Sequence, residues 1–79
     1  MERHERMGQR AELKPLQQRL LVECQALRDS LRRALPTHEE ADTLDGQTIL
    51  NTAIALKTSL DELAGVNKKI DILTRELGI

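Results

Sequence analysis

Two segments of this chain, residues 13–35 and 47–77, carry aliphatic residues at alternating intervals of three and four. This spacing constrains the fold more than any other feature. In the first segment Leu13, Leu20 and Leu27 recur every seven residues. In the second segment the same spacing continues almost unbroken. Side chains spaced in this way form one stripe along an α-helix. The sequence therefore predicts two long amphipathic helices and an all-α fold.

Residues 36–46 separate the two helices, and several of them interrupt helical structure. Pro36 disfavours the helical conformation in the residue before it, which ends the first helix. Thr37 and Glu40 have the spacing of a capping box, which predicts a short helical turn in the connection. Three residues near the end of the connection suit the N-cap of the second helix: Asp42, Thr43 and Asp45. We expect that helix to begin between Thr43 and Thr48.

Residues 1–12 continue the first helix less well. Arginines take the place of apolar residues on the extrapolated stripe, at Arg3, Arg6 and Arg10. We therefore expect this segment to be frayed or partly disordered. Pro15 leaves two alternatives open. Either the stable helix begins near Pro15, because proline is tolerated in a first turn, or it begins earlier and bends there.

The size of the chain indicates that a single copy buries too little apolar surface to form a stable core. A chain of 79 residues forms one domain, near the size at which one core barely offsets chain entropy. Its one cysteine rules out an intrachain disulfide. The apolar stripes are also wider than the seam of a two-stranded coiled coil. The sequence therefore predicts an antiparallel helical hairpin that assembles into a homodimeric four-helix bundle or coiled coil.

The predicted oligomer or partner interface follows the two stripes. Its residues are Leu13, Leu20, Leu27, Leu31, Leu56, Leu60, Leu63, Val66, Asn67, Ile70, Leu73 and Leu77. When the seven positions of the repeat are lettered a to g, with a and d on the seam, Asn67 occupies an a position and Val66 a g position. Two hypotheses follow. Either a buried Asn67 fixes the register and the number of chains, or Val66 and Ile70 carry the core and Asn67 is solvated at its edge.

The sequence contains no motif for catalysis or cofactor binding. It has no glycine-rich phosphate loop, no HExxH, no nucleophile elbow and no repeated CxxC. Cys24 lies at a seam position, where a small buried hydrophobic residue is expected. Carboxylates gather in the connection between His38 and Asp45, but their spacing does not match a calcium-binding loop. We expect no enzymatic activity, no cofactor and no metal site.

The surplus of apolar positions favours a self-associating protein-interaction module, such as a small regulator, an adaptor or a chaperone-like protein. Self-association or the helix of another protein must cover these positions, and a homodimer needs the fewest assumptions. No apolar run approaches the ~20 residues of a membrane span. The lone thiol favours a reducing compartment. The expected location is therefore cytoplasmic, without a membrane partner.

The alternative function is nucleic-acid binding through a basic face at Arg28, Arg32 and Arg33. The predicted hairpin resembles, in shape alone, the Rop family of plasmid copy-control proteins, whose hairpins form dimeric four-helix bundles and bind RNA. The resemblance covers no shared motif. This chain also has no Phe, Tyr or Trp to stack on bases. No residue is therefore carried over from that family, and the face is defined by its charges alone.

Overall fold

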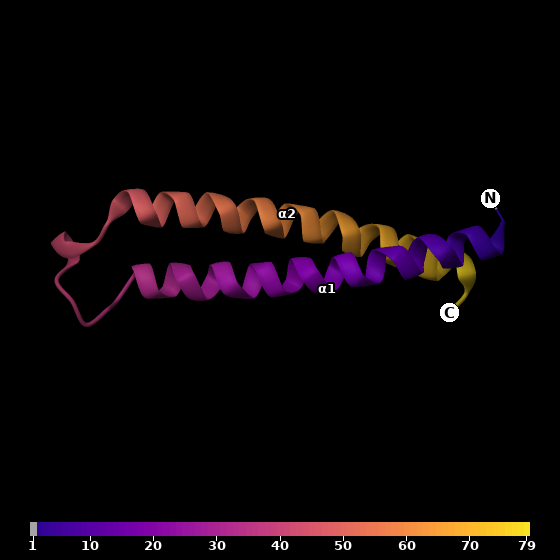
Figure 1. The fold of residues 1–79 in the computed structure, drawn as a ribbon, viewed down its shortest axis with the longest axis horizontal. Helices are drawn as coiled ribbons and strands as arrows, with labels where there is room; N and C mark the ends of the chain where they lie inside the picture. Colours follow the sequence, from indigo (N-terminus) through magenta and orange to yellow (C-terminus); the bar gives the residue numbers. More distant parts are fainter. Residues whose placement is uncertain (1) are drawn as a thin grey trace.

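The structure is a hairpin of two long antiparallel α-helices (Figure 1). It is a computed structural model and describes residues 2–79. Helix α1 spans Arg3–Ala34 and helix α2 spans Gly46–Leu77. The connection contains one turn of 3₁₀ helix, η1, at Ala41–Thr43. The molecule measures 58 × 17 × 16 Å. The predicted all-α hairpin is confirmed, and residues 2–79 contain no strand.

Helix α1 begins at Arg3, the earlier of the two starts considered, and passes through Pro15. The Pro15 ring is exposed, so it does not disturb the packing against α2. Residues 3–12, for which the sequence predicts fraying, are helical in the structure. Met1, which the same prediction covers, lies outside the described residues.

Contacts with the last turns of α2 explain why the first part of α1 is helical. The guanidinium of Arg3 donates a hydrogen bond to the Leu77 carbonyl oxygen over 2.7 Å. The Arg10 Nε atom donates to the Thr74 hydroxyl over 2.8 Å. Arg6 forms an ion pair with Glu76, with 3.2 Å between Nε and Oε2. Helix propensity along α1 alone does not include these contacts between distant parts of the chain.

The connection differs from its prediction in one detail. The capping box predicted at Thr37 does not form. Instead Glu40 precedes η1 without a side-chain cap, and the Thr43 hydroxyl donates to the Glu40 carbonyl oxygen over 2.7 Å. Short 3₁₀ turns of this kind close with bonds between residues three apart. The predicted short helical turn is therefore present, but it lies at Ala41–Thr43.

Asp45, one of the three predicted caps, is the N-cap of α2. Its side chain accepts hydrogen bonds from the backbone N–H of Gln47 over 3.1 Å and of Thr48 over 3.3 Å. It also accepts from the Thr48 hydroxyl over 2.7 Å. The hydrogen bonds from the Thr48 hydroxyl, the Thr48 N–H and the Gln47 N–H favour the carboxylate and lower the pKa of Asp45 below its usual 3.8.

Gly78 terminates α2. Its φ of 72° lies in the left-handed region that glycine adopts without steric cost. The Gly78 N–H donates to the carbonyl oxygens of Arg75 and Thr74, and the Ile79 N–H also donates to Thr74. This is the Schellman arrangement, which satisfies carbonyl groups that the end of a helix leaves free.

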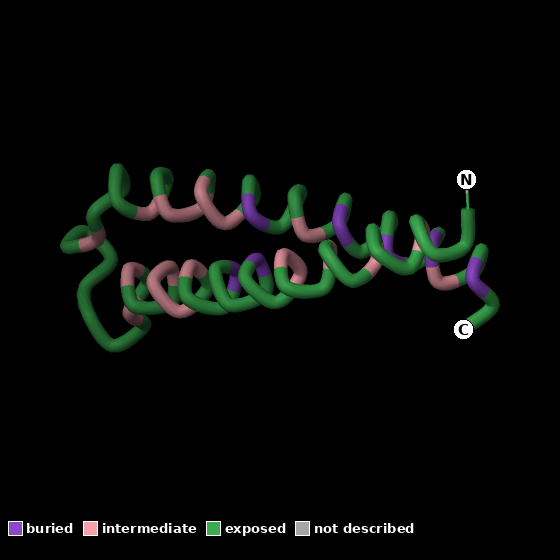
Figure 2. The backbone as a smooth tube through the Cα atoms, turned by 45° about the vertical axis from the view of Figure 1, so that its right-hand side comes forward, coloured by how far each residue is buried: buried purple, intermediate pink, exposed green. Residues whose placement is uncertain are grey.

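The core lies toward the chain ends (Figure 2). Leu20, at 1% exposed, forms a buried cluster with Val66 and Ile70. Half-buried leucines pack around this cluster: Leu13, Leu16 and Leu63. Between Gln25 and Thr58, by contrast, no residue is buried. One chain therefore builds a core in only part of its length.

The stripe that α2 turns toward α1 is shifted by one position from the predicted seam. Its buried residues are Ser59, Val66, Ile70, Leu73 and Leu77, which occupy g and d positions. The a positions of Leu60 and Asn67 are exposed. Burying Val66 and Leu73 removes more apolar surface from water than burying Asn67 and Thr74, and it leaves the Asn67 amide accessible to solvent. Within one chain, the second hypothesis for Asn67 holds.

Candidate protein-interaction surface

The hairpin itself uses most of the residues predicted for the interface. Buried are Leu20, Val66, Ile70, Leu73 and Leu77. Half-buried are Leu13, Leu27, Leu31, Leu56 and Leu63. Only Leu60 and Asn67 are exposed. A surface for a second protein must therefore be sought beside the stripe that joins α1 to α2.

Two side-chain hydrogen bonds fix how α1 and α2 are aligned. Arg10 bonds to Thr74, and the Gln17 amide donates to the Asn67 side-chain oxygen over 2.6 Å. The second pair lies one heptad further along α1 and one heptad back along α2. All four residues occupy a positions, so one edge of the hairpin carries a row of matched a residues. Asn67 therefore has an amide partner in its own chain.

The row of a residues changes from polar to apolar along the molecule. One further heptad step places Cys24 opposite Leu60, and the next places Leu31 opposite Ala53. Cys24 and Leu60 line one groove of about 300 Å³, together with Leu21, Gln25, Arg28, Leu56 and Leu63. We call the side on which this groove opens the Leu60 face. It is apolar toward the connection and polar toward the chain ends.

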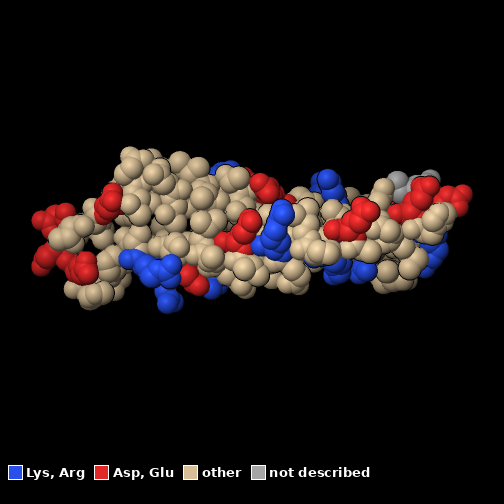
Figure 3. All heavy atoms as spheres, viewed as in Figure 1, with Lys and Arg blue, Asp and Glu red and all other residues tan. Residues whose placement is uncertain are grey.

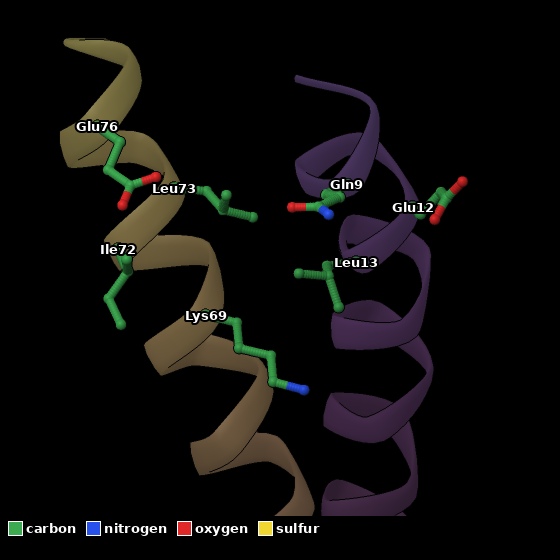
Figure 4. Close-up of a pocket in the computed structure, with 7 residues that line it drawn as sticks. All are labelled: Gln9, Glu12, Leu13, Lys69, Ile72, Leu73 and Glu76. Carbon is green, nitrogen blue, oxygen red and sulfur yellow. The ribbon is translucent and has the colours of Figure 1, made fainter. Parts of the chain in front are cut away.

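The opposite side of the hairpin has a different character. A groove of about 490 Å³ opens there, lined by Gln9, Glu12, Leu13, Lys69, Ile72, Leu73 and Glu76 (Figure 4). Leu13 and Leu73 point toward each other across it, whereas Glu12 points outward. We call this side the Glu12 face. Its rim consists mainly of charged c positions, so it is less suited to apolar contact than the Leu60 face.

The exposed apolar residues favour the Leu60 face. Large hydrophobic side chains are exposed at Met7, Leu21, Val22, Leu35, Leu50, Ile54, Leu60, Ile72 and Ile79. Five of these occupy a or e positions, which border the Leu60 face: Met7, Leu21, Leu35, Leu50 and Leu60. None occupies a c or g position. Residues 46–56 also contain no charged residue, and Figure 3 shows a broad uncharged surface over this part of α2.

Two of the three arginines of the candidate nucleic-acid face share one side of α1. Arg28 at an e position and Arg32 at a b position are one helical turn apart and lie on the same side of the helix, whereas Arg33, at a c position, lies about 100° further around it. The Arg28 guanidinium lies 3.1 Å from the Asp29 carboxylate, and Arg33 donates to the Ser30 hydroxyl. The basic face therefore consists of Arg28 and Arg32 on one side of α1, with Arg33 beside it, and Arg28 already has a carboxylate next to it in its own chain.

The candidate chemical groups lie apart from one another. Cys24 is a free, buried thiol. His38 and Glu39 lie 3.7 Å apart on the exposed connection. Within residues 2–79 no group of three or more His, Cys, Asp or Glu side chains is arranged to hold a metal ion. None of the helices in that range has the length and apolar character needed to cross a membrane.

One exposed ion pair, between Lys57 and Asp61, lies on the rim of the Leu60 face. The Lys57 ammonium lies 2.6 Å from the Asp61 carboxylate, one helical turn further on. The hydrogen bond to Asp61, together with the charge of that carboxylate, raises the pKa of Lys57 above its usual 10.5. Both side chains are largely exposed, so solvent screens this pair and its contribution to stability is small.

Sequence reasoning missed the polar residues on the rim of the Leu60 face, above all Lys14 and Asp71, and the role of Gln17 as the partner of Asn67. Both omissions have one cause: which residues of α1 and α2 lie side by side depends on the alignment of the two helices, which local sequence does not give. The equal heptad spacing of the two helices assigns these residues to a and e positions, but it does not give the height of one helix relative to the other. Comparison of the chain with protein-family models, with curated proteins and with solved structures finds no match.

Proposed function

We propose that this chain is a non-enzymatic, self-associating helical module that acts through protein–protein contacts. Small regulators, adaptors and chaperone-like proteins work in this way, by presenting helical faces to other chains. The observation that carries the proposal is the incomplete core. No residue between Gln25 and Thr58 is buried, although this range contains leucines and isoleucines at regular helical spacing.

The surface area of the chain supports the proposal. A compact protein of this size exposes about 4,800 Å², whereas this chain exposes 5903 Å². The difference is about 1,100 Å², which is comparable to the roughly 800 Å² that each partner buries in a stable protein interface. Much of the excess is apolar: Leu50 is 52% exposed and Ile54 is 55% exposed. A second chain would remove this apolar surface from water.

The solution mass tests the proposal directly. Multi-angle light scattering is measured from about 1 to 100 μM, the range in which many homodimers dissociate, and circular dichroism is recorded on the same samples. We expect the mass of a dimer at the upper end and a strongly helical spectrum. A helical monomer throughout this range would contradict self-association. A poorly helical monomer would contradict it as well, and would assign the missing half of the core to another protein.

A further inference from the structure

We propose that the Leu60 face docks a second copy of this chain, with the connections of both copies at the same end. In this arrangement a two-fold axis runs along the long axis of the molecule, and α1 of each copy lies against α2 of the other. The inference rests on the proposed self-association and adds the face and the orientation. The occupant is therefore a second copy, bound through matched positions on the rim of the Leu60 face.

The area of the face suits a complete overlap. Each helix has 32 residues, which corresponds to about 48 Å at 1.5 Å per residue. With a width of 17 Å, the face covers about 800 Å², the area that one partner contributes to a stable interface. An overlap limited to the apolar half would bury about 400 Å² per copy, which is the range of weak contacts. A stable dimer therefore needs the full length of the face.

The e positions on the rim favour the same-end orientation. Gln17 lies opposite Asn67 within one chain, so Lys14 and Asp71 lie at equal heights to within one residue, about 1.5 Å. A half turn about the long axis preserves height and places Lys14 against Asp71 of the second copy. Lys14 forms no ion pair within residues 2–79, so its charge is available for that contact. Asp71 lies 2.7 Å from Arg75 of its own chain, but its side chain is 56% exposed and can accept from Lys14 as well.

Two more rim pairs match under the same operation. Leu35 lies at the height of Leu50 of the second copy, and both are exposed in one chain. Leu21 lies at the height of Ala64 of the second copy. In this way the apolar end of each copy covers the apolar end of the other, and the arrangement occurs twice because the contact is two-fold symmetric.

One rim pair brings like charges together, Arg28 and Lys57 of the second copy. Each already has a carboxylate in its own chain: Arg28 lies 3.1 Å from Asp29, and Lys57 lies 2.6 Å from Asp61. Both basic side chains are more than two-thirds exposed, so solvent and salt screen their repulsion. This pair weakens the dimer slightly but does not prevent it.

The opposite-end orientation fits less well. With complete overlap it would place the apolar half of each face over the polar half of the other. Leu60 would then lie at the height of the Gln17 and Asn67 amides of the second copy, and these polar side chains would lose water without gaining partners. In the same-end orientation, the Gln17 and Asn67 amides instead meet the same two amides of the second copy, which can exchange hydrogen bonds.

A charge-exchange experiment tests the rim contact. Lys14→Glu and Asp71→Lys each create two repulsive contacts in a homodimer. A mixed dimer of the two variants contains two attractive contacts. We mix ¹⁵N-labelled Lys14→Glu with unlabelled Asp71→Lys at low salt and count dimers by native mass spectrometry. The mixed dimer should rise from the random half to about nine-tenths of the dimers, since exposed pairs contribute modestly.

A matched exchange on the other side of the hairpin is the control. Glu12→Lys and Lys69→Glu alter exposed charges of the Glu12 face in the same way, and their mixture should stay at the random proportion. A preference in the control mixture, or none in the Lys14 and Asp71 mixture, would overturn the assignment of the face. Because rim contacts within one chain are unchanged by mixing, they cannot produce the expected preference.

A distance measurement tests the orientation. A nitroxide label is attached at Thr37→Cys, in a Cys24→Ala background, and electron–electron distances between copies are recorded. In the same-end orientation the two labels should lie less than about 35 Å apart, because packed helices are separated by 8–10 Å. Distances near the 58 Å length of the molecule would overturn the orientation while leaving self-association intact. A monomer by light scattering would overturn both proposals.

A pair of neighbouring substitutions checks the face without relying on charge exchange. Leu21→Glu places a carboxylate on the rim of the Leu60 face, and Val22→Glu places one on the adjacent outward position. Val22 is 60% exposed and Leu21 is 39% exposed, so exposure alone predicts little effect of either. The dissociation constant of the dimer should rise at least tenfold for Leu21→Glu and stay unchanged for Val22→Glu. Equal effects of the two variants would contradict the Leu60 face as the interface.

Discussion

At the scale of single residues, the effect of a substitution on stability depends on the backbone conformation, as two glycines of α2 illustrate. Gly65 lies inside the helix, and Gly78 follows its last turn in the left-handed region, with a φ of 72°. A methyl group would meet no atom within 4 Å at either position. Any difference between alanine variants at the two positions must therefore come from the backbone and not from crowding.

We expect the same substitution to have opposite effects at these positions. Gly65→Ala should raise the free energy of unfolding by about 1 kcal/mol, because alanine favours the helical conformation over glycine by that amount. Gly78→Ala should lower it by about 1 kcal/mol, because the left-handed conformation strains an alanine. Urea unfolding of both variants at one protein concentration measures the difference. Destabilisation by Gly65→Ala would show that another chain approaches this position.

At the scale of elements, the start of α2 depends on one carboxylate. The folded state lowers the pKa of Asp45 from 3.8 through hydrogen bonds from Thr48 and Gln47. A lowered pKa in the folded state means that the cap contributes fully above the unfolded value of 3.8. This contribution is lost as the pH falls through the lower folded value. The first turn of α2 should therefore loosen only in strongly acidic solution.

We expect the amide signals of Gln47 and Thr48 to move toward their unfolded positions below pH 3.8 in a nuclear magnetic resonance titration. Asp45→Asn should abolish this pH dependence, because asparagine can cap a helix without titrating. Asp42→Asn is the matched control, since Asp42 lies in η1 and accepts no hydrogen bond from α2. If Asp42→Asn removed the titration and Asp45→Asn did not, the cap would be assigned to the wrong residue.

The helices were predictable from sequence because heptad spacing leaves few alternatives once Pro36 and Gly46 interrupt it. Helix α2 begins at Gly46, within the expected range from Thr43 to Thr48. The helical state of residues 3–12 was not predictable from local sequence, because it depends on arginine contacts with the last turns of α2. Local propensity describes a segment by itself and omits such contacts.

The seam of α2 was predictable only to within one position. Both the a and d residues and the g and d residues of α2 follow a spacing of three and four, so the pattern alone does not choose between them. The structure turns Val66 toward α1 and leaves Leu60 47% exposed. The pairing of the rim residues Lys14 and Asp71 was not predictable from the sequence for a related reason. Their equal height depends on the alignment of α1 with α2, which the connection and the Gln17–Asn67 bond determine.

At the scale of the whole molecule, the amides of Gln17 and Asn67 divide the Leu60 face into an apolar half and a polar half. This division makes the two ends of the face chemically different. In the proposed dimer, the difference selects the same-end orientation, since like halves meet only in that arrangement. A polar layer of this kind usually costs stability and gains a unique alignment.

The double variant Gln17→Leu with Asn67→Leu separates these two effects. Two added leucines extend the apolar half of the face toward the chain ends, so the dimer should dissociate at a lower concentration than the wild type, by about tenfold or more. Without these amides, the opposite-end orientation no longer buries polar groups under the leucine side chains of the second copy. Labels at Thr37→Cys should then give two populations of distance, one below about 35 Å and one near the 58 Å length of the molecule. If the dimer became tighter but kept only the short distance, the rim pair of Lys14 and Asp71 would determine the orientation, and the amide layer would not.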